Sequence, residues 1–193
     1  MVSDPISDKR SAPHQLDLVI DFVNTADLET GEEALGDPAG LASWLAGRGL
    51  LGEGEILSPA QLGSALELRE ALRASMLANN GAPAVPSAAA QLEAAARRGE
   101  LSVHFRDGTA RLEPCAEGVD GALAALLAPV AEAMSDGDWA RVKACRADEC
   151  HWAFYDFSRN RSGTWCDMAV CGNREKVRAY RERSPRKNPN PAR

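Results

Sequence analysis

Four cysteines near the C-terminal end form two pairs with the same spacing. Cys145 and Cys150 are separated by four residues, and Cys166 and Cys171 repeat that spacing after fifteen intervening residues. A four-residue loop lets two thiolates turn towards one point, and a second such loop completes a tetrahedron around a metal ion. The pattern therefore predicts one structural Zn²⁺ held by four thiolates, with two disulfides or unrelated free thiols as the alternatives.

A basic segment follows the fourth cysteine directly. Residues 172–183 predict a helix, with Cys171 held at its start, where the helix N-terminus would stabilise thiolate charge. The helix carries five cationic side chains, which are Arg174, Lys176, Arg178, Arg181 and Arg183. A basic helical face beside a zinc site can follow the phosphates of nucleic acid, so DNA is the predicted partner. The alternative is a solvated helix that only completes the zinc module.

The overall charge of −6 conceals an asymmetry along the chain. Residues 141–193 contain 13 Lys+Arg and 6 Asp+Glu, whereas residues 1–140 contain the other 9 basic and 22 acidic residues. The C-terminal part is therefore formally +7 and the rest −13. This asymmetry favours a basic part that faces a polyanion. The alternative is attraction between the two parts, or between one part and a neighbouring subunit.

Composition predicts an ordinary globular protein. With 193 residues, of which 45% are hydrophobic and 26% charged, the chain can form one substantial domain and a small appendage. We expect no membrane span, because no apolar run approaches about 18 residues. The first residues lack the apolar core of a secretory signal, so we expect a cytoplasmic protein whose thiols stay reduced and free to bind metal.

The acidic part, residues 1–140, is predicted to contain both strands and helices. Apolar residues alternate over 16–25, which predicts a strand. Helices are predicted from Pro38 and from Pro59, the latter behind a capping box at Ser58, and Arg69 and Arg73 on that helix are read as surface or ion-pair residues. Further helices are expected from Ser87 to Gly99 and over 119–134, with a bend near Pro129 in the second.

A β-hairpin is predicted between these last two helices. Asp107-Gly108 forms a two-residue turn that sets Phe105 opposite Ala110 and Val103 opposite Leu112. All four apolar side chains then fall on one face of the hairpin. Cys115 follows the hairpin and is interpreted as a small core or edge residue.

The elements around the cysteines predict a treble-clef-like order of knuckle, hairpin, knuckle and helix. A strand over 139–144 leads into the first cysteine loop, an extended aromatic segment follows it, and residues 158–163 form a basic loop before Cys166. His151 is the one competing ligand; alternatively, it donates a hydrogen bond to one of the metal-binding thiolates without touching the metal. The aromatic side chains of Trp152, Phe154 and Trp165 are expected to build the core of this small module rather than to stack on bases.

The sequence Cys171-Gly172-Asn173-Arg174, with the three upstream cysteines, resembles the CGNR zinc finger family. Residues 16–25, 41–50 and 68–72 resemble the ABATE region that precedes this finger. The resemblance implies a stress-induced transcription regulator whose finger is proposed to bind DNA. Residues 161–164 depart from the run of arginines that often stands before the third cysteine, which weakens a phosphate-contacting role for that loop.

Together these features predict an α+β protein, in which an N-terminal domain of helices and antiparallel strands precedes a small treble-clef-like zinc finger. The expected divisions are a disordered start (1–14), an ABATE-like domain (15–138), a zinc finger (139–184) and a flexible basic tail (185–193). The predicted function is DNA-binding transcription regulation, with a homodimer as a further partner arrangement. The alternative is a protein–protein adaptor with a purely structural zinc. No nucleophile elbow, phosphate loop or catalytic zinc motif is present, so we expect no enzyme.

Overall fold

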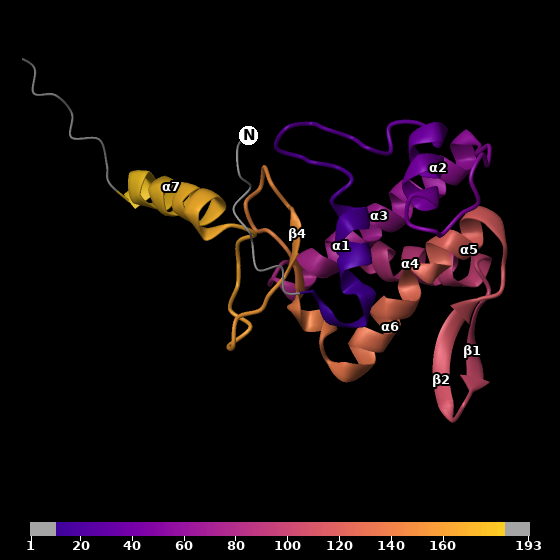
Figure 1. Ribbon diagram of the computed structural model, residues 1–193. Helices are drawn as coiled ribbons and strands as arrows, with labels where there is room; N and C mark the ends of the chain where they lie inside the picture. The colour runs from indigo at the N-terminus through magenta and orange to yellow at the C-terminus, as the bar shows by residue number, and fades with distance from the viewer. Residues whose placement is uncertain (1–10, 184–193) are drawn as a thin grey trace, which may run out of the picture.

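A computed structural model describes residues 11–183, which form an α+β fold as the sequence predicts (Figure 1). Helices dominate, and the strands form two small antiparallel sheets. The α-helices are α1 (Leu16–Val23), α2 (Pro38–Ala46), α3 (Pro59–Asn79), α4 (Pro86–Arg98), α5 (Gly118–Ala125), α6 (Leu127–Asp136) and α7 (Asn173–Arg183). The strands are β1 (Leu101–Arg106), β2 (Thr109–Pro114), β3 (Val142–Ala144) and β4 (Ala153–Tyr155). Three single turns complete the chain, namely η1 (Pro13–Gln15), η2 (Trp139–Arg141) and η3 (Met168–Gly172).

Helix α3 connects the helical body to the zinc module, because it packs against α1, α2 and α4 and also against β3. The predicted capping box at its start is confirmed. The backbone N–H of Gln61 donates to the Ser58 hydroxyl, and the Ser58 backbone N–H donates to the Gln61 side chain. Leu68 and Leu72 on the buried face of α3 are excluded from solvent and anchor the core.

The predicted strand over 16–25 is wrong, because residues Leu16–Val23 form helix α1. Six of the eight residues of this segment are apolar, so the apolar positions fit an alternating pattern and a helical one equally well. The buried side chains are Leu16, Val19, Phe22 and Val23, which recur at helical spacing. Phe22 packs against Trp44 of α2 with ring centroids 5.3 Å apart, and this tertiary contact favours the helix.

The hairpin forms in the predicted register, with Phe105 opposite Ala110 and Val103 opposite Leu112. Asp107 and Gly108 both have positive φ, as a two-residue turn of this kind requires. The shared apolar face, however, is not covered towards the tip, where Val103 and Phe105 are exposed. In Figure 1 the hairpin projects from the helical body on the side opposite α7.

Arg69 and Arg73 are ion-paired as expected but are buried, with 6% and 3% of their surface exposed, rather than on the surface. Both guanidinium groups contact the carboxylate of Glu70, and Arg69 also binds Glu33 at 2.7 Å. Burial would lower the pKa of Arg69, but its carboxylate partners outweigh that cost and raise it.

Two predicted helix boundaries lie elsewhere. Helix α4 starts at Pro86 behind Val85, so Ser87 does not cap it. The helix expected over 119–134 forms as α5 and α6, and the two are separated at Leu126, three residues before Pro129. Proline has no N–H and its ring crowds the carbonyl four residues earlier, which explains why the break precedes it.

The structure also differs from the sequence prediction where the two expected domains begin. Residues 11–14, expected to be disordered, pack on the body through Ala12, which is 5% exposed, and through the turn η1. Residues 139–144 form the turn η2 followed by a strand of three residues, not one continuous strand. The remainder of the predicted disordered start (1–10) and the predicted basic tail (185–193) lie outside the described residues.

Within residues 11–183, one helical stretch is long and apolar enough to cross a membrane by length and composition alone. This stretch is Gly118–Asp136, which comprises α5 and α6. Half of it is buried inside the structure, as in a core helix.

Candidate metal centre

The first cysteine pair lies at the end of a short strand pair. β3 and β4 are antiparallel, with Ala144 opposite Ala153, and the ladder continues through a bond from the Cys145 N–H to the Trp152 carbonyl. The Cys150 N–H donates to the Ala147 carbonyl at 2.9 Å, which closes the loop. The hairpin of the module is therefore made by the strands on either side of the first cysteine loop, whereas the sequence placed it after that loop.

The second cysteine pair is held by a capped turn that leads into α7. The Asp167 carboxylate accepts hydrogen bonds from the N–H groups of Ala169 and Val170, and the turn η3 carries Cys171 towards the first pair. The side chain of Asn173 donates to the Ala169 carbonyl at 3.0 Å. This bond ties Asn173 to the backbone of the turn, and α7 starts directly at the metal centre.

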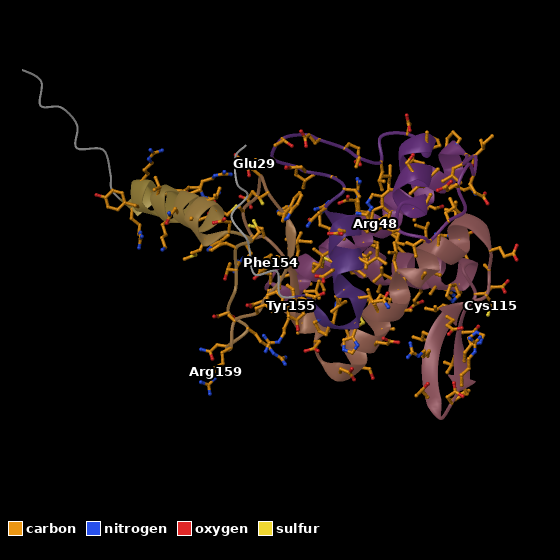
Figure 2. All side chains as sticks on the ribbon, in the orientation of Figure 1. Glu29, Arg48, Cys115, Phe154, Tyr155 and Arg159 are labelled. Atoms are coloured by element: carbon orange, nitrogen blue, oxygen red, sulfur yellow. The ribbon has the colours of Figure 1, made fainter. Side chains whose placement is uncertain are left out.

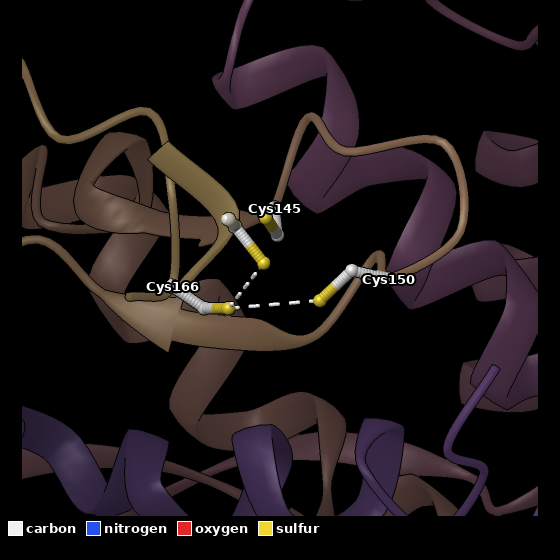
Figure 3. A group of neighbouring side chains, drawn as sticks. Cys145, Cys150 and Cys166 are labelled. Atoms are coloured by element: carbon white, nitrogen blue, oxygen red, sulfur yellow. Dashed lines mark hydrogen bonds between the residues drawn. The ribbon is translucent and has the colours of Figure 1, made fainter. Parts of the chain in front are cut away.

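The four thiols converge on one point (Figure 3). Their sulfur atoms all lie within 4.8 Å of one another, and those of Cys145, Cys150 and Cys171 belong to buried residues. The Sγ of Cys166 lies 3.6 Å from that of Cys150 and 3.7 Å from that of Cys171. A tetrahedron with Zn–S bonds of about 2.3 Å has edges of about 3.8 Å, so these separations fit a Zn²⁺ ion. His151, the competing ligand, is not part of this group.

The charges of the thiols depend on one another. The hydrogen bond with Cys166 lowers the pKa of Cys145 to about 5, and the same contact raises the pKa of Cys166. Burial, followed by the contact with Cys150, raises the pKa of Cys171 to about 12. One thiolate thus opposes the ionisation of its neighbours, and a divalent cation allows all four to ionise together.

Comparison with known protein families agrees with this geometry. Residues 141–184 match the CGNR zinc finger. Residues 16–137, more than half of the chain, match the ABATE family, described as "Putative stress-induced transcription regulator". The chain belongs to the ABATE family. No curated protein matches its sequence. The finger and the four converging cysteines together establish a zinc-binding site for one ion.

The ABATE part clamps the CGNR finger through side chains that the sequence did not single out. Asn24 pairs with Ala153 like an extra strand, accepting from its N–H at 2.7 Å and donating to its carbonyl at 2.9 Å. Asn80 donates to the carbonyls of Ala144 and Thr164, both at 2.8 Å. The carboxamide of the neighbouring Asn79 donates to the carbonyls of Trp139 and Val142.

A buried ion pair holds the loop before Cys166. Lys143 and Asp156, which are 4% and 3% exposed, are joined by an Nζ–Oδ2 distance of 2.7 Å. Lys143 also donates to the carbonyls of Arg161 and Gly163, and Asp156 accepts from the N–H groups of Ser158 and Gly163. Burial would raise the pKa of Asp156, but the bonds from Lys143 and Ser158 outweigh it and lower the pKa to about 2.

The aromatic side chains only partly follow the expectation of a metal core. Trp165 packs against the buried cysteines, whereas Phe154 is half-buried and Trp152 is 36% exposed. The basic loop 158–163 carries Arg159 at its tip, which points away from the body in Figure 2. Cys115, expected to be a core or edge residue, is exposed beside His104.

The five predicted nucleic-acid contacts all lie on α7, which has no buried residue. Two of them bind acidic groups of the same chain. Arg174 contacts Glu29 of the loop between α1 and α2 and reaches Glu149 at 3.9 Å, while Arg178 contacts Asp148 at 3.2 Å and Glu175 at 2.6 Å. Within residues 11–183, the other three, Lys176, Arg181 and Arg183, form no ion pair.

Proposed function

We propose that this protein is a DNA-binding transcription regulator in which the zinc centre orients α7 as the main phosphate-contacting element. The observation that carries the proposal is the position of α7. The helix begins at the metal centre and extends away from the helical body in Figure 1, and none of its residues is buried. Five cationic and two acidic side chains lie along it, so that it presents a net charge of +3 to solvent.

The dimensions of α7 suit a duplex. Its 11 residues span about 16 Å at about 1.5 Å per residue. The major groove of B-DNA is about 12 Å wide and admits an α-helix. Four thiolates fix the start of the helix through the metal, so the cations beyond it are held at defined positions rather than on a free arm.

The cations of α7 differ in their contacts. Lys176 and Arg181 are available to phosphates as the structure stands, whereas Arg174 and Arg178 are bound to carboxylates of the chain itself. Arg183 donates to a backbone carbonyl one turn earlier in its own helix. Phosphate contacts supply sequence-independent affinity, and the choice of sequence requires contacts to base edges. Lys176 and Arg181 should therefore supply most of the initial, salt-sensitive affinity for DNA.

The direct experiment is selection from a pool of random duplexes by the zinc-loaded full chain. We expect retention of duplex at low salt and enrichment of particular sequences. The variant Lys176→Glu/Arg181→Glu should lose at least about tenfold in affinity, because two attractive contacts become repulsive.

The matched control is Arg97→Glu/Arg98→Glu, which reverses two exposed arginines on α4, in the body rather than the finger. It should bind as the unmodified protein does. Absence of duplex binding at low salt, or equal losses in both variants, would contradict the role given to α7. Binding without sequence enrichment would reduce the function to non-specific association.

A protein–protein adaptor is a second candidate, favoured by two exposed apolar side chains on the same helix. Val177 is 48% and Tyr180 67% exposed, and they lie three residues apart on α7. Capture that is insensitive to salt and lost on Val177→Ser/Tyr180→Ser would favour this function. We propose no enzymatic role, because four thiolates leave the zinc no open coordination position for a substrate or water.

A further inference from the structure

The β1–β2 hairpin exposes an apolar face that the fold leaves without a partner. Val103 is 55% exposed and Phe105 81% exposed. Leu101, on the same face at the base of the hairpin, packs against the core. A two-stranded ribbon alone is marginally stable in water, and further strands or a covered face stabilise it. The outer half of the hairpin therefore has both an apolar surface and a reason to bind another element.

The outer edge of β1 is open. The hairpin is a two-stranded sheet, so within the described part of the chain β1 has no neighbour other than β2. A two-residue turn closes on a hydrogen-bonded pair, here Arg106 and Thr109, and hydrogen-bonded pairs then alternate along the ladder. The backbone N–H and C=O groups of Leu101, Val103 and Phe105 consequently point away from β2. Such an edge is a template for another strand.

The sequence of this edge is complementary to itself. Residues 100–106 read Glu-Leu-Ser-Val-His-Phe-Arg. When two copies run antiparallel about Val103, Leu101 of each lies opposite Phe105 of the other. In the same register Glu100 lies opposite Arg106, so that opposite charges meet at both ends. In this register Val103 lies opposite Val103 of the second copy, and Leu101 lies opposite its Phe105. These are the residues whose free backbone N–H and C=O groups point away from β2, so the two edges can form hydrogen bonds with each other.

We propose that the chain forms a two-fold homodimer in which two β1 strands pair antiparallel about Val103 and create a four-stranded sheet. The exposed Phe105 then lies beside Leu101 of the second copy, where that copy's hairpin meets its own core. Arg106 is 70% exposed and contacts Glu113 at 3.3 Å, a weak surface pair that it can exchange for Glu100 of the second copy. This interface does not depend on DNA binding.

The test is sedimentation equilibrium of the zinc-loaded full chain. We expect a concentration-dependent monomer–dimer equilibrium for the unmodified protein. Val103→Lys should abolish the dimer, because two lysines would face each other across the two-fold axis. The control Ile56→Lys places the same charge at a residue that is 95% exposed in the body, and it should dimerise normally. Thermal melting of the two variants checks that each remains folded.

A charge exchange tests the register itself. Arg106→Glu should weaken dimerisation by at least about tenfold, because two attractive pairs become repulsive. Adding Glu100→Arg to it should restore the dimer, whereas the intramolecular contact to Glu113 stays lost. A monomer at all concentrations, a dimer that survives Val103→Lys, or a double variant without rescue would overturn the proposal.

Discussion

At the scale of single residues, the ion pair of Lys143 and Asp156 determines how the second cysteine pair is presented. Its two side chains make hydrogen bonds to three residues of the loop 158–163, and this loop leads into Trp165 and Cys166. Every donor of the Lys143 ammonium group is used, which offsets the cost of burying the charge. The metal site thus depends on charges that do not touch the metal.

Removal of the Lys143 charge should strongly destabilise the folded protein. In Lys143→Met the Asp156 carboxylate stays buried without a counter-charge, so we expect the free energy of unfolding to fall by about 3 kcal/mol or more. Urea unfolding of the zinc-loaded protein measures this. Arg97→Met, an exposed arginine paired only at the surface of α4, should cost less than about 1 kcal/mol. Equal costs in the two variants would contradict the role of the buried pair.

The same pair predicts a dependence of stability on pH. The pKa of Asp156 is about 2 in the folded protein and about 3.9 in an unfolded chain, so its contribution is complete above pH of about 5. That contribution, about 2–3 kcal/mol, is lost as the pH falls towards 2. The difference in free energy of unfolding between the unmodified protein and Asp156→Asn should shrink over this interval. The comparison cancels thiol protonation, which both proteins share, and a difference that stays constant would refute the assignment.

At the scale of elements, the acidic loop between α1 and α2 reaches the basic helix of the finger. Figure 2 shows Glu29 beside the start of α7, where it binds Arg174. The pKa of Arg174 is raised by this hydrogen bond first and by the charge of Glu29 second. If α7 binds phosphates, Glu29 competes with them for the same guanidinium group.

Neutralising this loop carboxylate should therefore strengthen DNA binding. We expect Glu29→Gln to raise the affinity for duplex several-fold at low salt, measured by fluorescence anisotropy. Glu32→Gln is the matched control, because Glu32 lies in the same loop and makes no ion pair with α7. Equal affinities for the two variants would show that the contact between Glu29 and Arg174 does not compete with DNA.

The clamp between α3 and the finger makes a second prediction at this scale. Asn80→Ala leaves the carbonyl of the buried Ala144 without its side-chain donor, and the Thr164 carbonyl keeps only the Arg146 N–H, so we expect a loss of about 2 kcal/mol in stability. Because Ala144 precedes Cys145 and Thr164 lies close to Cys166, zinc affinity should fall as well. Competition with a chromophoric chelator measures zinc affinity. Gln91→Ala, a carboxamide deletion on α4, should leave it unchanged.

Local patterns in the sequence were sufficient to predict some elements of the fold and insufficient to predict others. The cysteine spacing, the Asp107-Gly108 turn and the Ser58 capping box act over a few residues, and the structure contains all three. The segment Leu16–Val23 was misassigned because its six apolar residues out of eight satisfy strand and helix periods alike. The clamp from Asn24 to Ala153 spans 129 residues of sequence, so no local spacing could reveal it.

At the scale of the whole molecule, the two exposed elements lie at opposite ends of the body. Figure 1 shows α7 leaving one side and the β1–β2 hairpin leaving the other. A dimer built through β1 would keep both α7 helices free, so that dimerisation and DNA binding could occur together. The two α7 helices would then lie at the far ends of such a dimer, so that each could contact a separate stretch of duplex.

The measurement that tests the central claim most directly is the salt dependence of duplex binding, compared between two neutralised variants. In Lys176→Gln/Arg181→Gln the plot of log affinity against log salt concentration should lose about 1.8 in slope, because two phosphate contacts are removed. In Arg97→Gln/Arg98→Gln on α4 the slope should stay that of the unmodified protein. An unchanged slope in the α7 variant would show that this helix does not contact the phosphates and would contradict the account.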